Sequence, residues 1–221
     1  MSTVLRMALA TLAFGLVHSA LASRAAKHMA GRALGERRRD GGYRLFYVVQ
    51  SCAAFGALLA WGARQPARTV WRLHGPGAVL ARAGQVAGAV QLLAGLREIG
   101  PLRWAGIDHL RAWQHGEPMP PALGAQGPER RPDGSLTTGG PFRHSRHPLN
   151  FAALPLFWCT PHLTSRRLGF NLAATVYLVL GSLHEENRLR ALHGDDYRAW
   201  AGRVPFFVPG LPTGGRLAWR G

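Results

Sequence analysis

Cysteine and acidic side chains are both scarce in this sequence. Its two cysteines, Cys52 and Cys159, lie within apolar runs, so we expect neither a disulfide framework nor a cysteine-based metal site. The 221 residues include 11 acidic against 27 basic side chains, a formal charge of +16. Charged residues make up 17% of the chain, below the roughly 25% of ordinary soluble domains. They are confined to a few segments between long apolar runs, which argues against a nucleic-acid partner.

Two of the apolar runs, Val4–Ala22 and Leu45–Gly62, approach the about 20 residues that a helix needs to cross the hydrocarbon core. The sequence Ala20-Leu21-Ala22 at the end of the first run leaves a cleaved signal peptide as the alternative interpretation. The strongly basic residues 23–44 that follow are typical of a cytoplasmic loop and resist export. They favour a retained membrane helix.

Three further apolar runs predict additional membrane helices: Gly84–Leu96, Phe151–Leu163 and Leu168–Leu183. Only residues 164–167 separate the last two runs, so we expect these to form an antiparallel helical hairpin. The predicted fold is therefore an all-α, polytopic integral membrane protein with about five transmembrane helices, a C-terminal helical hairpin and a cytoplasmic tail.

The distribution of basic residues predicts the topology. Residues 23–44 carry seven Lys and Arg, and residues 101–148 and 184–221 carry six each, whereas residues 63–77 and 164–167 carry three and two. Because cytoplasmic segments carry the excess of basic residues, we expect the N-terminus outside and the C-terminus inside a bacterial inner membrane. The predicted organisation is a helical part (1–100), a cytoplasmic loop (101–148) and a hairpin with its tail (149–221).

Polar residues are concentrated at the cytoplasmic ends of the predicted hairpin. Arg143 and Arg146 precede its first helix, and Glu185 and Glu186 follow its second, so the hairpin brings guanidinium groups close to carboxylates. Each of these groups also has a purely structural interpretation. The arginines are suited to anchoring at the membrane interface, and the glutamates to pairing at helical spacing with Arg188 and Arg190.

Histidines suggest two other kinds of site. His144 and His147 stand three residues apart, as metal ligands often do, but no third ligand accompanies them at a diagnostic spacing. His18 in the first run and His184 after the fifth leave axial ligation of a haem open. No matched pair of histidines lies at mid-span on two helices, so we expect no metal.

The last third of the chain carries an ordered motif: Arg146-His147-Pro148, then a helical hairpin, then Glu185-Glu186 and a segment that ends in Val204-Pro205. This motif resembles that of the isoprenylcysteine carboxyl methyltransferase superfamily. Weaker matches, His18-Ser19 and Tyr43-Arg44-Leu45, resemble the bacterial branch of methanethiol S-methyltransferases and denitrification-linked relatives.

The resemblance implies S-adenosylmethionine as methyl donor. Its carboxylate suits Arg146 and His147, and its hydroxyl and amino groups suit glutamate acceptors, while paired glycines let the backbone approach closely. The implied cofactor-binding residues are Gly139, Gly140, Arg146, His147, Pro148, Glu185, Glu186 and Tyr197. The implied catalytic residues are Arg143, Arg146 and Asn150.

Asn150 stands where the superfamily usually has tyrosine, which leaves the substrate open. The predicted function is an integral membrane S-adenosylmethionine-dependent methyltransferase acting on a small thiol or another lipophilic acceptor. The alternatives are a non-catalytic, denitrification-linked accessory protein of the same fold and an isoprenylcysteine or phospholipid methyltransferase. The expected partners are the lipid bilayer and a small-molecule acceptor.

Overall fold

The computed structural model describes residues 1–121, 127–128, 130 and 133–211. The chain divides into two compact units, each assembled from three stretches. Unit 1 comprises Met1–Arg72, Gly100–Leu123 and His162–Tyr177, and unit 2 comprises Leu73–Ile99, Gly124–Pro161 and Leu178–Gly221. The last 10 residues of the predicted tail lie outside the described residues.

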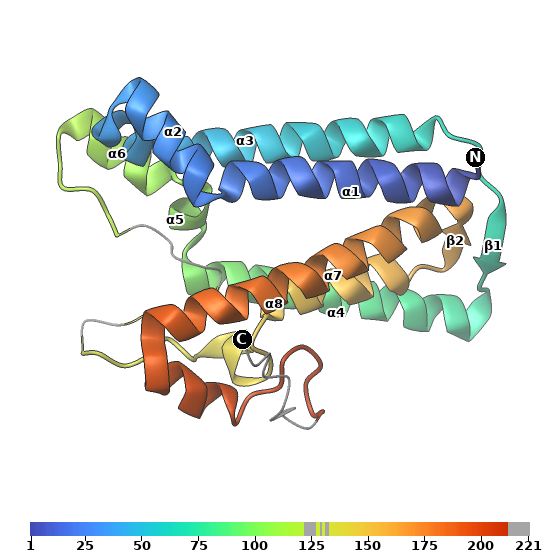
Figure 1. Ribbon diagram of the computed structural model, residues 1–221. Helices are drawn as coiled ribbons and strands as arrows, with labels where there is room; N and C mark the ends of the chain where they lie inside the picture. The colour runs from blue at the N-terminus through green and yellow to red at the C-terminus, as the bar shows by residue number, and fades with distance from the viewer. Residues whose placement is uncertain (122–126, 129, 131–132, 212–221) are drawn as a thin grey trace. The chain divides into compact units, whose positions relative to one another are not determined.

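Unit 1 is built on two long helices, α1 (Thr3–Ala22) and α3 (Glu36–Ala63), which lie side by side and are joined by α2 (Arg24–Leu34) (Figure 1). Ser2 begins α1 by accepting a hydrogen bond from the backbone N–H of Leu5 at 3.3 Å. Two short helices pack at the α2 end of the unit: α5 (Pro101–Ala105) and α6 (Ile107–His115). Strand β1 (Thr69–Arg72) pairs antiparallel with β2 (His162–Thr164).

Unit 2 contains α4 (Gly75–Ile99), the 3-10 turn η1 (Gly140–Arg143), α7 (Pro148–Trp158) and the second part of α8 (Ser165–Ala201). Its core is formed by Phe142, Leu149, Leu189, Tyr197, Trp200 and Val204. The hydrogen bond from Asn150 Nδ2 to Ser182 Oγ, 2.7 Å, places the start of α7 against α8. The predicted helical hairpin is therefore present.

Glycines on α4 allow this helix to pack tightly against α7, the first helix of the hairpin. A Cβ on Gly88 would lie 2.8 Å from the backbone oxygen of Ala152, and one on Gly84 would lie 2.7 Å from Cys159 Sγ. Small residues are used in this way wherever membrane helices approach closely. The Gly84-x-x-x-Gly88 pattern thus serves packing within one chain, whereas a Cβ on Gly56 would meet no other part of the described chain within 4 Å.

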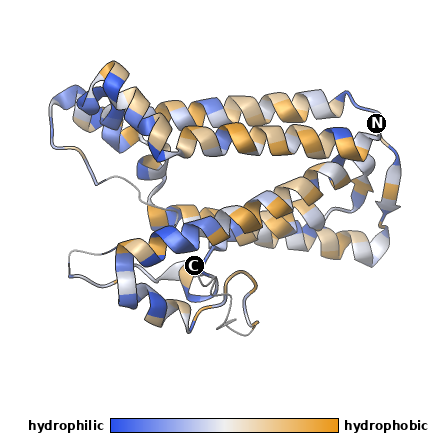
Figure 2. Ribbon diagram, in the orientation of Figure 1, coloured by the Kyte–Doolittle hydropathy of each residue, from blue (hydrophilic) through white to orange (hydrophobic). Residues whose placement is uncertain are grey.

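The all-α membrane fold that the sequence predicted is confirmed. In the described part of the chain, α1, α3 and α4 are long and apolar enough to cross a membrane, and Figure 2 shows hydrophobic residues along each of them. The third helix begins at residue 75 rather than 84 and has 25 residues, whereas the apolar run within it has 13. Helix α7, with 11 residues, extends only about 16 Å at ~1.5 Å per residue, so it is too short to span.

Several expected boundaries were wrong. The basic residues 23–44 form α2 and the first turns of α3 instead of a loop, because no proline interrupts them. Ser23 caps the start of α2, and Gly35 separates α2 from α3. The predicted fourth helix ends at Trp158, and its last residues form β2. The predicted fifth helix does not end at Leu183 but continues to Ala201, with a break at Gly194 (φ 57°, ψ −128°).

Candidate functional site

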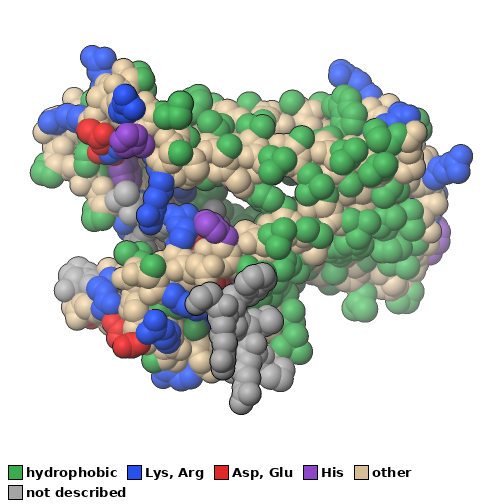
Figure 3. Space-filling view, viewed as in Figure 1, with side chains coloured by type: hydrophobic (Ala, Val, Ile, Leu, Met, Phe, Trp, Pro, Cys, Tyr) green, Lys and Arg blue, Asp and Glu red, His purple; other side chains and the backbone are tan. Residues whose placement is uncertain are grey.

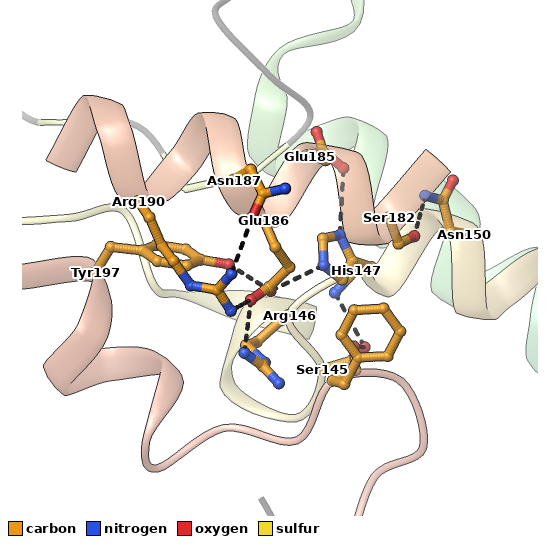
Figure 4. A network of polar contacts seen from close by, with 11 residues as sticks. Ser145, Arg146, His147, Asn150, Ser182, Glu185, Glu186, Asn187, Arg190 and Tyr197 are labelled. Carbon is orange, nitrogen blue, oxygen red and sulfur yellow. Dashed lines mark hydrogen bonds and ion pairs between the residues drawn. The ribbon is translucent and has the colours of Figure 1, made fainter. Parts of the chain in front are cut away.

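A buried carboxylate, Glu186, organises the polar end of the hairpin in unit 2 (Figure 4). Its Oε2 accepts hydrogen bonds from Arg146 Nη1 at 2.8 Å and from Arg190 Nη2 at 2.7 Å. Its Oε1 accepts one from the Tyr197 hydroxyl at 2.7 Å and lies 3.0 Å from His147 Nε2. We call these residues, together with Glu185, the Glu186 cluster.

The local sequence fixes the backbone that carries two of these groups. Pro148 occupies the first turn of α7, where its missing N–H is not needed, so His147 becomes the residue before the helix. The Ser145 hydroxyl accepts a hydrogen bond from the His147 backbone N–H at 3.2 Å. The Arg146 backbone N–H donates to the carbonyl of Pro205 at 2.9 Å, which ties this loop to the tail.

His147 lies between two carboxylates. Its Nδ1 is 3.2 Å from Glu185 Oε2, and its Nε2 is 3.0 Å from Glu186 Oε1. Burial alone would lower the pKa of His147, but the hydrogen bonds and negative charges of both glutamates outweigh burial and raise the pKa above its ordinary value. Only the imidazolium form donates a hydrogen bond to both carboxylates, so the cluster favours a charged histidine.

The carboxyl group of Glu186 is held in its ionised form. Burial would raise its pKa, but hydrogen bonds from His147 and Tyr197 and the charge of Arg146 together lower the pKa below its ordinary value. Burial and the neighbouring charge of Glu186 raise the pKa of Tyr197, so its hydroxyl stays protonated and acts as a donor. Two carboxylates thus face three cationic side chains in the cluster.

These pKa shifts predict a pH window for the stability of the cluster. The raised pKa of His147 adds stability that is complete below its unfolded value of 6.5 and is lost as pH rises through the folded value. The lowered pKa of Glu186 adds stability that is complete above 4.5 and is lost as pH falls through the folded value. We therefore expect the contribution of the cluster to be greatest between pH 4.5 and 6.5.

Thermal unfolding of the wild type and His147→Gln across pH isolates this effect, because other groups cancel in the difference. One such group is His109 in unit 1, whose pKa is lowered by burial and by the charges of Arg103 and Arg44, so it acts in the opposite sense. The difference in unfolding temperature between the two proteins should become smaller as the pH rises above 6.5 and through the raised pKa of folded His147. A gap that is constant with pH would mean that His147 is not charged in the folded protein.

The structure brings together five of the predicted cofactor-binding residues: Arg146, His147, Glu185, Glu186 and Tyr197. The sequence assigned the arginine and histidine to one ligand group and the glutamates to others, whereas in the structure these side chains bind one another. The alternative of a structural ion pair at helical spacing is also present, because Glu186 pairs with Arg190 four residues later at 2.7 Å.

The other predicted site residues lie around this cluster. Arg143 ends η1 with its side chain exposed, so it contributes nothing to the cluster itself. Asn150, expected to act on the substrate, donates a hydrogen bond from its amide nitrogen to Ser182. Gly139 and Gly140 lie against α4, where a Cβ on the first would stand 2.8 Å from Glu98 Oε1.

Three groups near the site escaped the sequence analysis. Glu98 was not considered as a site residue, and no hydrogen bond or ion pair of its carboxylate appears among the described residues. Arg190 was considered only as a surface pair. Phe206, two residues after the Val204-Pro205 motif begins, lies with its ring centre 5.4 Å from the Arg146 guanidinium and 4.9 Å from the His147 ring.

One buried donor of the cluster remains available. Arg146 Nε is buried and has no hydrogen-bond partner among the described residues, although Nη1 of the same guanidinium pairs with Glu186. An unsatisfied buried donor carries a desolvation cost that a ligand oxygen would remove.

His18 and His147, which the sequence offered as haem and metal ligands, are both hydrogen-bonded within the described part of the chain. Both ring nitrogens of His18 are engaged within unit 1, with Ser51 Oγ at 2.9 Å from Nδ1 and the Tyr47 hydroxyl at 2.6 Å from Nε2. His147 likewise directs both ring nitrogens at carboxylates. Across the described ranges, no three His, Cys, Asp or Glu side chains gather as metal ligands would.

Comparison with known proteins confirms the predicted resemblance to methanethiol S-methyltransferases. The chain is 36% identical over 90 residues to the one from Pseudomonas deceptionensis, covering 41% of this chain and 34% of that protein. It is 42% identical over 66 residues to methanethiol S-methyltransferase 2 of Bradyrhizobium diazoefficiens, covering 30% of this chain and 26% of that protein. A third relative, from a Pseudomonas species, is 29% identical over 172 residues, covering 75% of this chain and 59% of its own length.

These similarities are partial. The chain spans about a third or less of the length of the first two relatives, and no protein-family profile and no solved structure matches it. All three relatives are named as methyltransferases, and the three long apolar helices indicate a membrane protein.

Proposed function

We propose that this chain is an integral membrane methyltransferase that uses S-adenosylmethionine and methylates a small thiol or another lipophilic acceptor. The observation that carries the proposal is the Glu186 cluster, in which the two halves of the motif meet although they are about 40 residues apart. The similarity to methanethiol S-methyltransferases supports the same class of reaction and makes a thiol the first acceptor to test.

We assign ligand binding to polar groups that have no hydrogen-bond or ion-pair partner among the described residues. We assign the carboxylate of the methyl donor to Arg146 Nε, the buried donor without a partner among the described residues. Glu98, which lies against Gly139 and Gly140, is suited to a positively charged group of the same ligand. Glu186 keeps Arg146 and His147 in place and is therefore a positioning residue.

S-adenosylmethionine supplies an electrophilic methyl group whose bond to the sulfonium sulfur breaks as the new bond to the acceptor forms. For a thiol acceptor the proton leaves to solvent, and the surplus positive charge of the cluster favours the thiolate. Such a displacement asks the protein mainly for alignment and for exclusion of water. Phe206 and Phe207 pack edge-on against His147 and shield that side of the cluster from water.

Isothermal titration of the detergent-purified protein with S-adenosylmethionine tests the donor. We expect the wild type to bind, and Glu185→Ala and His147→Ala to bind at least tenfold more weakly, because each removes a charged hydrogen-bond partner of the site, worth roughly 1.5–3 kcal/mol. Asp195→Ala, just beyond the break at Gly194 in α8 and with a side chain that is 93% exposed, is the control. Absence of binding to the wild type, or equal binding by all four proteins, would sink the proposal.

A radiolabelled methyl-transfer screen then identifies the acceptor class. Small thiols are expected to accept the label, ahead of prenylated cysteine and phospholipid amines. Binding of the donor without transfer to any of the three classes would favour the non-catalytic accessory protein instead.

A further inference from the structure

Helix α2 carries two exposed stripes of different chemistry. One stripe is basic and the other is apolar, and each repeats every four residues, which places its members along one line of a helix. The basic stripe consists of Arg24, His28 and Arg32, and the apolar stripe of Ala25, Met29 and Ala33. All six side chains are exposed, and Met29 is 68% exposed. An exposed methionine next to exposed arginines is typical of a helix that lies at the interface between water and lipid.

The opposite side of α2 is fixed to the rest of unit 1. Gly31 is buried, and a Cβ there would overlap the side chain of Glu36, while Ala26 and Ala30 are half-buried. Ser23 begins the helix by accepting a hydrogen bond from the backbone N–H of Ala26 at 3.1 Å. The two stripes therefore face away from unit 1 and do not arise from a poorly packed segment.

The positive charge of this region is not neutralised by its own acids. Residues 23–44 contain two acidic side chains, Glu36 and Asp40, and both pair with the same arginine, Arg39. Among the described residues, Arg24 and Arg32 have no ion pair with an acid. Figure 3 shows Lys and Arg side chains gathered at the end of unit 1 where α2 lies.

The position of α2 in the chain places it where lipid headgroups lie. It starts two residues after the end of α1 and stops two residues before the start of α3, and both of these helices are long and apolar enough to span. A helix held between two spanning helices lies near the surface of the bilayer. Its basic stripe meets the headgroup region and its apolar stripe the acyl boundary.

We propose that the exposed surface of α2 binds anionic phospholipid headgroups, with Arg24 and Arg32 contacting the phosphates and Met29 inserted beside the acyl chains. Free phosphate shares the headgroup chemistry, but it would make no use of the apolar stripe. The proposal is independent of methyl transfer, because α2 belongs to unit 1 and contributes no residue to the Glu186 cluster.

Native mass spectrometry of the purified protein, titrated in neutral detergent with phosphatidylglycerol or phosphatidylcholine, tests this surface. We expect the wild type to retain phosphatidylglycerol preferentially. The double variant Arg24→Glu and Arg32→Glu should lose that preference, because each basic residue near an anionic surface changes the affinity by about fivefold. The matched control is the double variant Arg68→Glu and Arg72→Glu, which reverses the charge of two exposed arginines beyond the other end of α3. It should keep the preference for phosphatidylglycerol.

A measurement on the unchanged protein covers the case in which the double variant fails to fold. Raising the salt concentration tenfold should weaken phosphatidylglycerol binding and leave phosphatidylcholine binding as it was. Inorganic phosphate at the concentration of the lipid should not compete. An unchanged preference in the α2 variant, an equal loss in the control variant, or full competition by phosphate would each overturn the proposal.

Discussion

Replacing Glu186 by glutamine is expected to be the most damaging single change in unit 2. The carboxylate is 2% exposed and neutralises Arg146, whose side chain is 8% exposed, so its removal leaves buried positive charge without compensation. Breaking a buried ion pair by removing one partner costs about 3–5 kcal/mol. Unfolding of Glu186→Gln in detergent should therefore begin at a much lower temperature than that of the wild type.

The control for this change is Asp195→Asn, which makes the same kind of carboxylate-to-amide replacement just beyond the break at Gly194 in α8. Asp195 pairs with Arg198, but the side chains are 93% and 64% exposed, and such surface pairs contribute little. Its stability should stay close to that of the wild type. If both variants unfold alike, the cluster does not hold unit 2 together.

The second large effect is expected from Gly88→Val on α4. The new Cβ would stand 2.8 Å from the backbone oxygen of Ala152, and backbone cannot move aside as a flexible side chain can. Overpacking of this kind costs about 1–3 kcal/mol, and here it also separates two helices that the site depends on. We expect lower stability and weaker binding of S-adenosylmethionine.

A valine at position 88 also changes the helix propensity, and Gly56→Val on α3 separates that effect from the packing effect. Gly56 lies in a spanning helix as well, but no atom lies within 4 Å of the place that a Cβ would occupy there, so the same substitution adds no overlap. The Gly88→Val variant should be less stable than the wild type, whereas Gly56→Val should be about as stable as the wild type. Equal tolerance at both would show that α4 and α7 do not need a small residue to pack.

The motif residues could be predicted from the sequence because their order along the chain is distinctive. Arg146 and His147 before one helix and Glu185 and Glu186 after another were expected to meet, and they do. Their partners were not predictable in the same way. Whether Glu186 binds a ligand, a neighbour on its own helix or an arginine across the hairpin depends on side-chain directions that spacing does not fix.

The helix boundaries were likewise predictable only in part. Apolar runs predicted α1 and the later part of α3, because about 20 apolar residues suffice to identify a membrane span. The same criterion shortened α4 and ended α8 too early, because helical structure does not stop where hydrophobicity stops. Residues 184–193 are mostly polar and still helical, since α8 needs only one buried face, provided here by Glu186, Leu189 and His193.

The sequence by itself determined that this protein is helical, that its runs are long and apolar enough to enter a membrane, and that the polar motif at the ends of its hairpin resembles that of membrane methyltransferases. Hydrophobic length and the order of residues are properties of the chain and are readable without coordinates. Only the tertiary structure decided which charges neutralise one another, that Arg146 keeps one buried donor without a partner among the described residues, and that the basic segment after α1 is a helix with two exposed stripes. Those properties depend on distances and directions between side chains, and folding alone sets them.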